Sequence, residues 1–393
     1  MPSRTQITII GAGPAGLTLG HLLQRAGIDT VILESRSRAY VEQRQRAGIL
    51  EQGTVDVLRA SGAGARMDAE GIRHDGIELR FDGESHRIDF PALTGGRSVM
   101  VYAQTEVVKD LIALREAPIL FEAEALDVTG LDGTSPEVRY RHEGVEHTLV
   151  SDAVVACDGF HGIGRTALPS PRVYERTYPY SWLGVLADVA PSCEELIYAR
   201  HERGFALHSM RTPTVSRLYL QVPNDTDPAA WSDDRIWDEL ATRMAVDGWS
   251  LATGPITSKG VTPMRSLVSE PLRHGRLFLA GDAAHIVPPT GAKGLNLAVA
   301  DVTLLADALL RWYRKGEESA LDAYSGRALA RVWRAETFSY EMTTMLHTDP
   351  SALPFDDRVR RERLRRAVTS PAASAVLAEN YVGAPFEGLW TVP

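Results

Sequence analysis

Apolar positions in the first 34 residues change from one spacing to another. The β-branched run 5–10 predicts a strand, apolar residues at helical spacing follow in 17–27 and end on a glycine, and the run 30–34 again predicts a strand. These runs together predict one strand–helix–strand unit. Further helices are expected over residues 54–66 and 104–115.

Strands are expected within 87–93 and 98–104, and the pattern changes at about residue 174. Short strand-like runs with turns between them fill residues 174–270, which favours an antiparallel sheet. Long helical patterns then cover residues 294–347 and 356–368. We therefore expect a mixed fold, in which a sheet-rich segment interrupts a helix-covered one.

A glycine motif lies inside the first unit. Gly11, Gly13 and Gly16 stand between the predicted strand and helix, where glycines permit a tight turn and let the backbone approach a pyrophosphate. Glu34 ends the next strand, at the spacing expected of a ribose-binding acid. The combination predicts a dinucleotide site. A second glycine pattern, at 62–67, follows a helix-like segment and is interpreted as a helix C-cap loop.

The stretch 281–298 combines an acid, a rigid turn and a helix start. Asp282 follows a predicted strand, residues 288–291 form a proline-containing turn, and a long helix is expected to begin near Gly294. A helix N-terminus stabilises negative charge, such as that of a reduced flavin. A glycine-rich connector would explain the small residues, but not the acid and the long helix on either side of them.

Composition and charge exclude several classes of protein. The 393 residues are 44% hydrophobic and carry a net charge of -9, which disfavours nucleic-acid binding. The two cysteines, Cys157 and Cys193, form no metal-ligand cluster, so no metal site is expected. No apolar run is long enough for a membrane span. These observations predict a cytoplasmic protein that binds neither membranes nor nucleic acid, and the basic run 358–368 is interpreted as a solvated helix face or an intersubunit contact.

Three segments carry a family resemblance. Residues 11–16 with Glu34, residues 156–165 and residues 281–296 resemble, in order and spacing, the three FAD fingerprints of the single-component flavoprotein aromatic hydroxylases. The resemblance covers essentially the whole chain. It implies an α/β (α+β) fold: a Rossmann-like FAD-binding domain of glutathione-reductase type, with an inserted antiparallel β-sheet substrate domain and C-terminal helices. The implied segments are 1–173 for the first part of the FAD-binding domain, 174–270 for the substrate domain, and 271–393 for the return to the FAD-binding domain and the helical region.

The activity implied by the resemblance is an FAD-dependent monooxygenation. The substrate would be 4-hydroxybenzoate, converted with O2 to 3,4-dihydroxybenzoate, and the enzyme would be a homodimer. Ser35 stands where well-known members have arginine, so NADPH and NADH stay equally open as the electron donor. Hydroxylation of another para-substituted benzoate, such as an aminobenzoate or a dihydroxybenzoate, and flavin binding without turnover are the alternatives.

The resemblance also assigns residues to each ligand. FAD would be held by Gly11, Gly13, Gly16, Glu34, Arg46, Gln104, Asp158, Arg217, Asp282, Gly291, Leu295 and Asn296. The substrate would contact Trp182, Leu196, Tyr198, Leu207, Ser209, Arg211, Tyr219 and Pro289. The catalytic group would comprise Tyr198, Tyr381, His74 and Pro289, with a proton path through Tyr381 and His74 to solvent. NAD(P)H would meet Arg36, Arg38, Tyr40, His161 and Arg265.

The residues themselves support part of this assignment. Period-two spacing puts Ser209 and Arg211 on one strand face, and Tyr219 on a neighbouring strand can face the same way, which suits a small carboxylate. Any one of the three alone is more often a solvated strand residue. A hydrogen bond from Tyr198 would stabilise a substrate phenolate, although a single buried tyrosine is more often a core aromatic. His74 alone would be interpreted as a surface histidine.

Overall fold

The computed structural model describes residues 2–44 and 48–386. Its first sheet has six strands in the order β18-β19-β12-β1-β2-β8. The central strand β1 (Ile7–Ile10) pairs in parallel with β2 (Thr30–Glu34) and β12 (Ala153–Ala156), and α1 (Pro14–Arg25) connects β1 to β2. Every residue of these three strands is buried, as in a parallel sheet covered on both faces. The predicted strand–helix–strand unit is confirmed.

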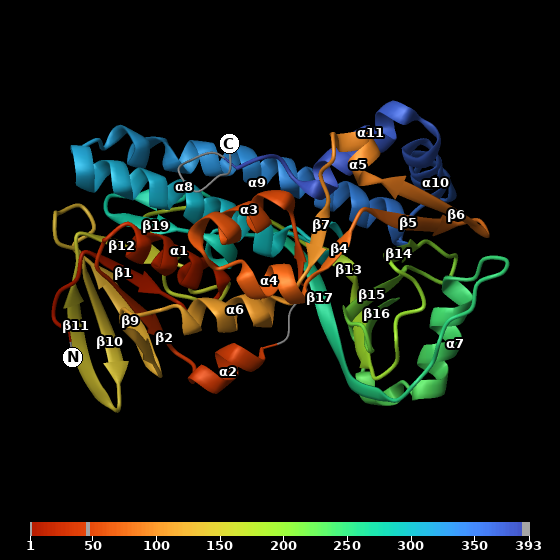
Figure 1. Ribbon diagram of the computed structural model, residues 1–393, viewed down its shortest axis with the longest axis horizontal. Coiled ribbons are helices and arrows are strands. Elements are labelled where there is room, and N and C mark those ends of the chain that lie inside the picture. Colours follow the sequence, from red (N-terminus) through yellow and green to blue (C-terminus); the bar gives the residue numbers. More distant parts are fainter. Residues whose placement is uncertain (1, 45–47, 387–393) are drawn as a thin grey trace.

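Two smaller sheets accompany the six-stranded sheet (Figure 1). Its remaining strands are β8 (Ile119–Phe121), β18 (Arg273–His274) and β19 (Leu277–Leu279). A three-stranded antiparallel sheet comprises β9 (Ala123–Thr129), β10 (Glu137–His142) and β11 (Val145–Val150). A second small sheet comprises β3 (Ile49–Leu50), β4 (Ile72–His74) and β7 (Val99–Val101).

The other half of the molecule contains an eight-stranded sheet in the order β20-β17-β13-β16-β15-β14-β5-β6 (Figure 1). Its strands are β5 (Gly76–Phe81), β6 (Glu84–Asp89), β13 (Arg172–Ala187), β14 (Leu196–Ala199), β15 (Ala206–Thr212), β16 (Val215–Val222), β17 (Ile256–Glu270) and β20 (His285–Ile286). Most neighbouring strands are antiparallel, as expected, but β14 pairs in parallel with β5. Residues 76–89 therefore extend a sheet that the sequence assigned to 174–270 alone.

The helices predicted from the sequence are present, but two of the predicted stretches are each divided into two helices, and other helices were not predicted. The pattern over 294–347 forms two helices, α8 (Gly294–Lys315) and α9 (Ser319–Leu346), because Gly316 ends α8 with φ 68°. The pattern over 54–66 likewise forms two. Its first helix is capped by Gly62 in the left-handed region, so the predicted C-cap loop at 62–67 is confirmed at its first glycine. The other helices are α2 (Arg38–Gln43), α3 (Gln52–Ser61), α4 (Ala65–Glu70), α5 (Phe90–Thr94), α6 (Gln104–Ala113), α7 (Asp233–Arg243), α10 (Pro354–Thr369) and α11 (Pro371–Val382).

One local expectation was wrong, and a second segment contains a helix that was not predicted. The strand expected within 87–93 ends at Asp89, whose side chain accepts from Ala92 N and caps α5, with Pro91 in the first turn of that helix. Within 174–270, Ser232 caps α7 in the same way, so this segment is not all sheet. Both caps are present in the sequence, but a cap alone does not predict a helix against a background of strand-like runs.

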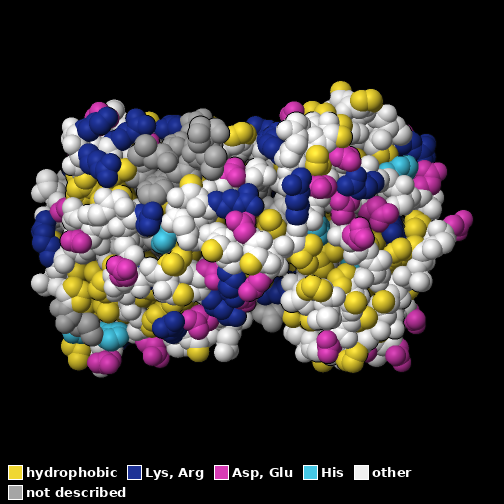
Figure 2. Space-filling view, viewed as in Figure 1, with side chains coloured by type: hydrophobic (Ala, Val, Ile, Leu, Met, Phe, Trp, Pro, Cys, Tyr) yellow, Lys and Arg dark blue, Asp and Glu magenta, His cyan; other side chains and the backbone are white. Residues whose placement is uncertain are grey.

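Long helices join the two halves. In Figure 1, α8 and α9 run along the parallel sheet, and α9 continues toward the eight-stranded sheet, where α10 and α11 also lie. Nothing among the described helices is long and apolar enough to cross a membrane. On the face shown in Figure 2, Lys and Arg side chains lie intermingled with Asp and Glu.

Candidate active site

The glycine turn after β1 leaves space beside the backbone. Gly11 has φ 101°, and a Cβ on it would lie 2.4 Å from the carbonyl oxygen of Cys157. A Cβ on Gly16 would lie 2.0 Å from the carbonyl oxygen of Gly11, so both glycines are required by close packing. A Cβ on Gly13, in contrast, would meet nothing within 4 Å, and α1 begins there with no side-chain cap and no acid in its first turn. This open, uncapped helix end fits a pyrophosphate.

Three carboxylates lie near the ends of the strands. The buried Glu34 carboxylate accepts from the backbone N–H groups of Ala12 (2.7 Å) and Arg36 (2.8 Å). Asp158 accepts from Gly164 N at 2.8 Å through one oxygen, while its other oxygen is buried with no partner among the described residues, and burial raises the pKa of this carboxyl. Asp282 is exposed in the 3-10 turn Gly281–Ala283. Glu34 thus braces the glycine turn with part of its acceptor capacity, and all three carboxylates have acceptor capacity left for a ligand.

The turn before α8 is fixed by Asn296. It comprises the 3-10 turn Pro289–Gly291 (η3) and Ala292, which has φ 54°. The Asn296 amide oxygen accepts from Glu51 N (2.9 Å) and from the hydroxyl of Thr54 (2.8 Å), and its amide nitrogen donates to the carbonyls of Ile49 (2.9 Å) and Ala292 (2.8 Å). All four bonds of this side chain lie within the protein. Asn296 would therefore contact FAD only through its backbone.

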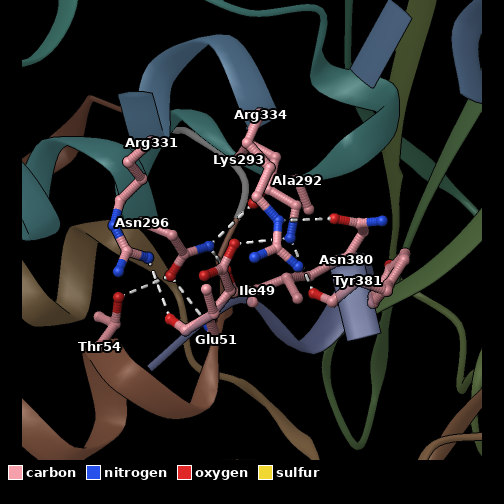
Figure 3. Close-up of polar contacts among 12 residues, drawn as sticks. Ile49, Glu51, Thr54, Ala292, Lys293, Asn296, Arg331, Arg334, Asn380 and Tyr381 are labelled. Atoms are coloured by element: carbon pink, nitrogen blue, oxygen red, sulfur yellow. Dashed lines mark hydrogen bonds and ion pairs between the residues drawn. The ribbon is translucent and has the colours of Figure 1, made fainter. Parts of the chain in front are cut away.

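A buried ion pair, which the sequence analysis did not predict, supports the same turn (Figure 3). Lys293 Nζ lies 2.6 Å from Glu51 Oε1 and donates to the carbonyl of Tyr381 at 2.8 Å. Both charged side chains are less than a tenth exposed, and burial lowers the pKa of Lys293. The lysine was visible in the sequence as the one basic residue of 281–298, but its partner is 242 residues away.

The two predicted catalytic tyrosines meet in the core. The Tyr198 hydroxyl on β14 lies 2.7 Å from the Tyr381 hydroxyl on α11, and each tyrosine is 1% exposed. Burial raises the pKa of both hydroxyls, so both are neutral at neutral pH. Trp182, Leu196 and Leu207 belong to the same buried hydrophobic cluster as this pair. The structure thus brings together five of the residues assigned to substrate and catalysis.

The residues assigned to the carboxylate end lie on β15 and β16. The strand register pairs Leu207 with Tyr219 and Ser209 with Arg217, so these four share one face of the sheet. Ser209 Oγ donates to the Arg217 carbonyl at 3.0 Å, and the Arg217 guanidinium carbon lies 5.3 Å from the centre of the Tyr219 ring. Arg211 stands at a register shift and donates to the hydroxyl of Thr105 on α6 at 2.9 Å. Burial lowers the pKa of Arg211, which a bound carboxylate would offset.

His74 and Pro289 are the other two residues of the assigned catalytic group. His74 on β4 is fully buried, contrary to the surface position expected of it alone, and burial lowers its pKa to about 4. Neither of its ring nitrogens has a hydrogen-bond partner in the part of the chain that the structure describes. Its strand partner Val99 belongs to the same hydrophobic cluster as the tyrosine pair. Pro289 is exposed at the start of η3.

The residues assigned to NAD(P)H form two separate groups. On α2 and the preceding turn, Arg36 lies over the Tyr40 ring at 5.4 Å, whereas Arg38 is paired with Glu42 at 2.7 Å. In the second group, the exposed His161 and the half-buried Arg265 both contact the ring of Phe160, at 4.7 Å and 4.6 Å. Phe160 was not assigned a role by the sequence.

Three assigned FAD residues remain to be placed. Gln104 begins α6 beside Thr105, the partner of Arg211, and Leu295 is half-buried in the first turn of α8. Arg46 lies outside the described residues. Over those residues, no group of His, Cys, Asp and Glu could hold a metal ion.

Comparisons with known proteins bear on this geometry. A family described as "FAD binding domain" matches residues 4–339. The p-hydroxybenzoate hydroxylase of Acinetobacter baylyi is 48% identical over 389 residues, which cover 98% of this chain and 96% of the relative. The chain belongs to the FAD-dependent aromatic hydroxylases of the p-hydroxybenzoate hydroxylase type. It is thus a flavoprotein monooxygenase with FAD as its cofactor, as the sequence resemblance implied.

Solved structures confirm the fold. The crystal structure of p-nitrophenol 4-monooxygenase from Pseudomonas putida matches with a TM-score of 0.83 at 19% identity, covering 98% of this chain and 99% of that one. A probable FAD-dependent monooxygenase from Pseudomonas aeruginosa matches with a TM-score of 0.78 at 22% identity, covering 92% and 99%. At such low identity these likenesses concern architecture alone. They agree with a Rossmann-like FAD-binding fold that carries an inserted sheet and C-terminal helices.

Proposed function

We propose that this enzyme hydroxylates 4-hydroxybenzoate at position 3, giving 3,4-dihydroxybenzoate, with O2 and NAD(P)H. The observation that carries the proposal is the buried pair of hydroxyls of Tyr198 and Tyr381, which lies in one hydrophobic cluster with Trp182, Leu196 and Leu207. The name of the Acinetobacter relative supports the same substrate. An aromatic acid with a phenol opposite its carboxylate has the two polar ends that the residues on β15, β16 and the tyrosine pair would recognise.

The residues around the glycine turn fit FAD. Gly11, Gly13 and Gly16 would present backbone N–H groups to the pyrophosphate, and Glu34 and Asp282 would accept from ribose hydroxyls. The uncapped start of α8 would face the flavin ring, where its dipole stabilises negative charge. FAD supplies the oxygen-transfer chemistry when bound, and the protein supplies binding, orientation and electrostatics.

The carboxylate end of the substrate would be held by Arg211, Ser209 and Tyr219. A guanidinium binds a carboxylate through two parallel hydrogen bonds, and a half-buried one binds it more strongly than a solvated one. Ser209 donates to the Arg217 carbonyl and Arg211 to the Thr105 hydroxyl, so both hold protein acceptors that a carboxylate could replace. Exchange of these partners would keep the arginine hydrogen-bonded before and after binding.

The phenol end would be controlled by the tyrosine pair. Each hydroxyl has one hydrogen, so Tyr198 can donate to the substrate oxygen only while it accepts from Tyr381. This direction of the two bonds stabilises a phenolate, whose ring is richer in electrons than that of a phenol. Lowering a phenol pKa by about 2 units requires about 2.7 kcal/mol, and one hydrogen bond to a charged group supplies about 1.5–3 kcal/mol. Reversing both bonds would carry the proton outward, with His74 as its proposed route to solvent.

The electron donor would bind near the two surface groups described above. Arg36, Arg38 and Tyr40 would contact the adenosine half of NAD(P)H. His161 and Arg265, which form the second group, would also contact NAD(P)H. The family resemblance further implies that reduction waits for substrate. Equal rates of NAD(P)H oxidation with and without 4-hydroxybenzoate would contradict this gating.

One aerobic assay tests the proposal. Purified holoenzyme is incubated with NADPH or NADH and with 4-hydroxybenzoate, 4-aminobenzoate or 2,4-dihydroxybenzoate in turn, and the products are separated by chromatography. We expect 3,4-dihydroxybenzoate as the main product. If only one of the other two acids gave a hydroxylated product, that acid would be the substrate, and the substrate would still be a para-substituted benzoate. Absence of any hydroxylated product from FAD-loaded protein would favour flavin binding without turnover.

We also propose a cytoplasmic homodimer, with the three-segment domain division given by the sequence, except that residues 76–89 extend the sheet of the substrate domain. The exposed apolar side chains of Leu353 and Phe355 at the start of α10, and of Val376 on α11, support self-association because such side chains favour burial in an interface. Light scattering on the purified enzyme measures the number of chains per particle, and a monomer at micromolar concentration would contradict the dimer.

A further inference from the structure

His347 is a buried histidine to which no role in the reaction has been assigned above. It follows α9 directly, as the C-cap residue, and is 1% exposed. Its ring is stacked on those of Tyr180 (4.7 Å between centres, 9° between planes) and Phe205 (4.3 Å, 29°). These two rings, together with that of Trp182 at 5.9 Å and 12°, hold the imidazole in one orientation.

Hydrogen bonds at both ring nitrogens fix the tautomer of His347. Nδ1 lies 2.8 Å from the carbonyl oxygen of Thr343, which can only accept, so Nδ1 carries the hydrogen. Nε2 lies 2.6 Å from Nε1 of Trp182, which can only donate, so Nε2 accepts. Burial lowers the pKa of His347 to about 3, and the ring therefore stays neutral in the pH range of enzyme assays. The indole N–H of Trp182 is paired by this one nitrogen.

Trp182 and Thr343 extend this arrangement in two directions. The Trp182 ring packs against Tyr219 at 4.8 Å, on the face assigned to the substrate. The Thr343 hydroxyl lies 2.9 Å from that of Thr290, in the η3 turn that precedes α8. Thr290, Thr343, His347 and Trp182 are all less than a tenth exposed. One turn of helix thus links the turn proposed to face the flavin to the proposed substrate wall.

We propose that His347 is a positioning residue, which holds the Trp182 ring in the substrate wall at a fixed place relative to the η3 turn. The inference rests on the proposed function, because it takes Trp182 and η3 to border the substrate and the flavin. Hydroxylation requires the ring carbon and the oxygen donor to be aligned closely, and a misplacement of about 1 Å can reduce a rate by about 100-fold. His347 would act through Trp182, without touching the substrate.

A double-mutant cycle on the holoenzyme tests the inference. His347→Leu leaves the Trp182 N–H unpaired, Trp182→Phe leaves His347 Nε2 unpaired, and the double variant leaves neither. We expect each single variant to lower Tm, and the double variant to lie within about 1 °C of the lower single variant because the two losses are shared. In His347→Leu, hydroxylated product per NAD(P)H consumed should fall about tenfold, with FAD content unchanged.

Two further variants separate positioning from general stability. His347→Gln can accept from Trp182 and donate to Thr343, so it should restore product per NAD(P)H to within about twofold of the parent. His208→Leu is the matched control. It removes a histidine that is also 1% exposed, in the same sheet, but strand-paired with Ile197 and Leu218, which belong to a different hydrophobic cluster. This control should lower Tm and leave product per NAD(P)H unchanged.

Several results would overturn the inference. Additive Tm losses in the cycle would show that His347 and Trp182 act independently. An unchanged product ratio in His347→Leu, or an equal fall in His208→Leu, would reduce His347 to a structural role. A parent enzyme that gives no hydroxylated product would instead overturn the proposed function, and the Tm cycle would still decide whether His347 holds Trp182.

Discussion

Two buried polar clusters lie within the same core, and they differ in how completely they are bonded. Around the turn before α8, none of the side-chain atoms of Glu51, Lys293 and Asn296 is buried without a partner in the described structure. The second cluster comprises the pair Tyr198–Tyr381 and the assigned residues His74, Ser209, Arg211, Arg217 and Tyr219; in it, both ring nitrogens of His74 and one guanidinium nitrogen of Arg217 have no partner in the described structure. The side chains of the first cluster are bonded within the protein. The second keeps bonding capacity that a substrate, water or a cofactor would use, because buried polar groups are rarely left unpaired.

Breaking the complete cluster should have the largest effect. Lys293→Met leaves the Glu51 carboxylate buried without its partner, which costs about 3–5 kcal/mol of unfolding free energy. Denaturant unfolding of the holoenzyme measures the loss. The control is Arg358→Met, which removes an exposed pair with Glu362 and should cost about 0–1 kcal/mol. Equal stability of the two variants would mean that the Lys293–Glu51 pair contributes no more to the free energy of unfolding than an exposed ion pair.

Removing Arg211 from the second cluster should weaken substrate binding but leave the FAD content unchanged. Arg211→Ala removes the proposed carboxylate partner and should weaken 4-hydroxybenzoate binding by about 2–5 kcal/mol. Titration of the flavin absorbance with substrate measures this change, and Arg211→Lys should lie between the parent and the alanine variant because it keeps the charge but not the two-pronged bond. Loss of FAD from Arg211→Ala would place this arginine in the cofactor site instead.

Changing Tyr198 at the phenol end should alter the pKa of the bound substrate. Tyr198→Phe removes a hydrogen bond worth about 1.5–3 kcal/mol to the phenolate, so the pKa of the bound phenol should rise by about 1–2 units and product per NAD(P)H should fall. A pH titration of the absorbance of the bound substrate follows the ionisation. Tyr180→Phe, in the same cluster but outside the pair, should leave that pKa unchanged. An unchanged pKa in Tyr198→Phe would rule out the phenolate role.

The smallest expected effect concerns His74 and pH. Its pKa is lowered from 6.5 to about 4 in the folded protein, so the unfolded chain binds the proton more readily. The stability it confers is therefore complete above about pH 6.5 and is lost as pH falls toward 4, amounting to about 1 kcal/mol between pH 7 and pH 5.5. His74→Gln should flatten the decline in unfolding free energy over this interval. An identical pH dependence in parent and variant would contradict the buried neutral histidine.

The phosphate-binding turn was predictable because its determinants are consecutive. Gly16 is a glycine because a Cβ would collide with the Gly11 carbonyl, and Gly11 is a glycine because its backbone adopts φ 101°; these local requirements leave a motif of fixed spacing in the sequence. The family resemblance supplied the substrate and catalytic residues, and the structure places Tyr198 beside Tyr381. The ion pair Lys293–Glu51 and the bond from Trp182 to His347 left no such signal, since neither pairing follows from spacing.

The same distinction applies to the molecule as a whole. The sequence by itself determined the strand–helix–strand unit, the helix C-cap at Gly62 and the start of α8 at Gly294, because backbone conformation and neighbouring residues decide such features. Only the tertiary structure decided that residues 76–89 extend the sheet of 174–270, and that Lys293, His347 and the tyrosines find their partners in the core. Those contacts join segments more than 100 residues apart, so they depend on how whole elements pack and not on any local pattern.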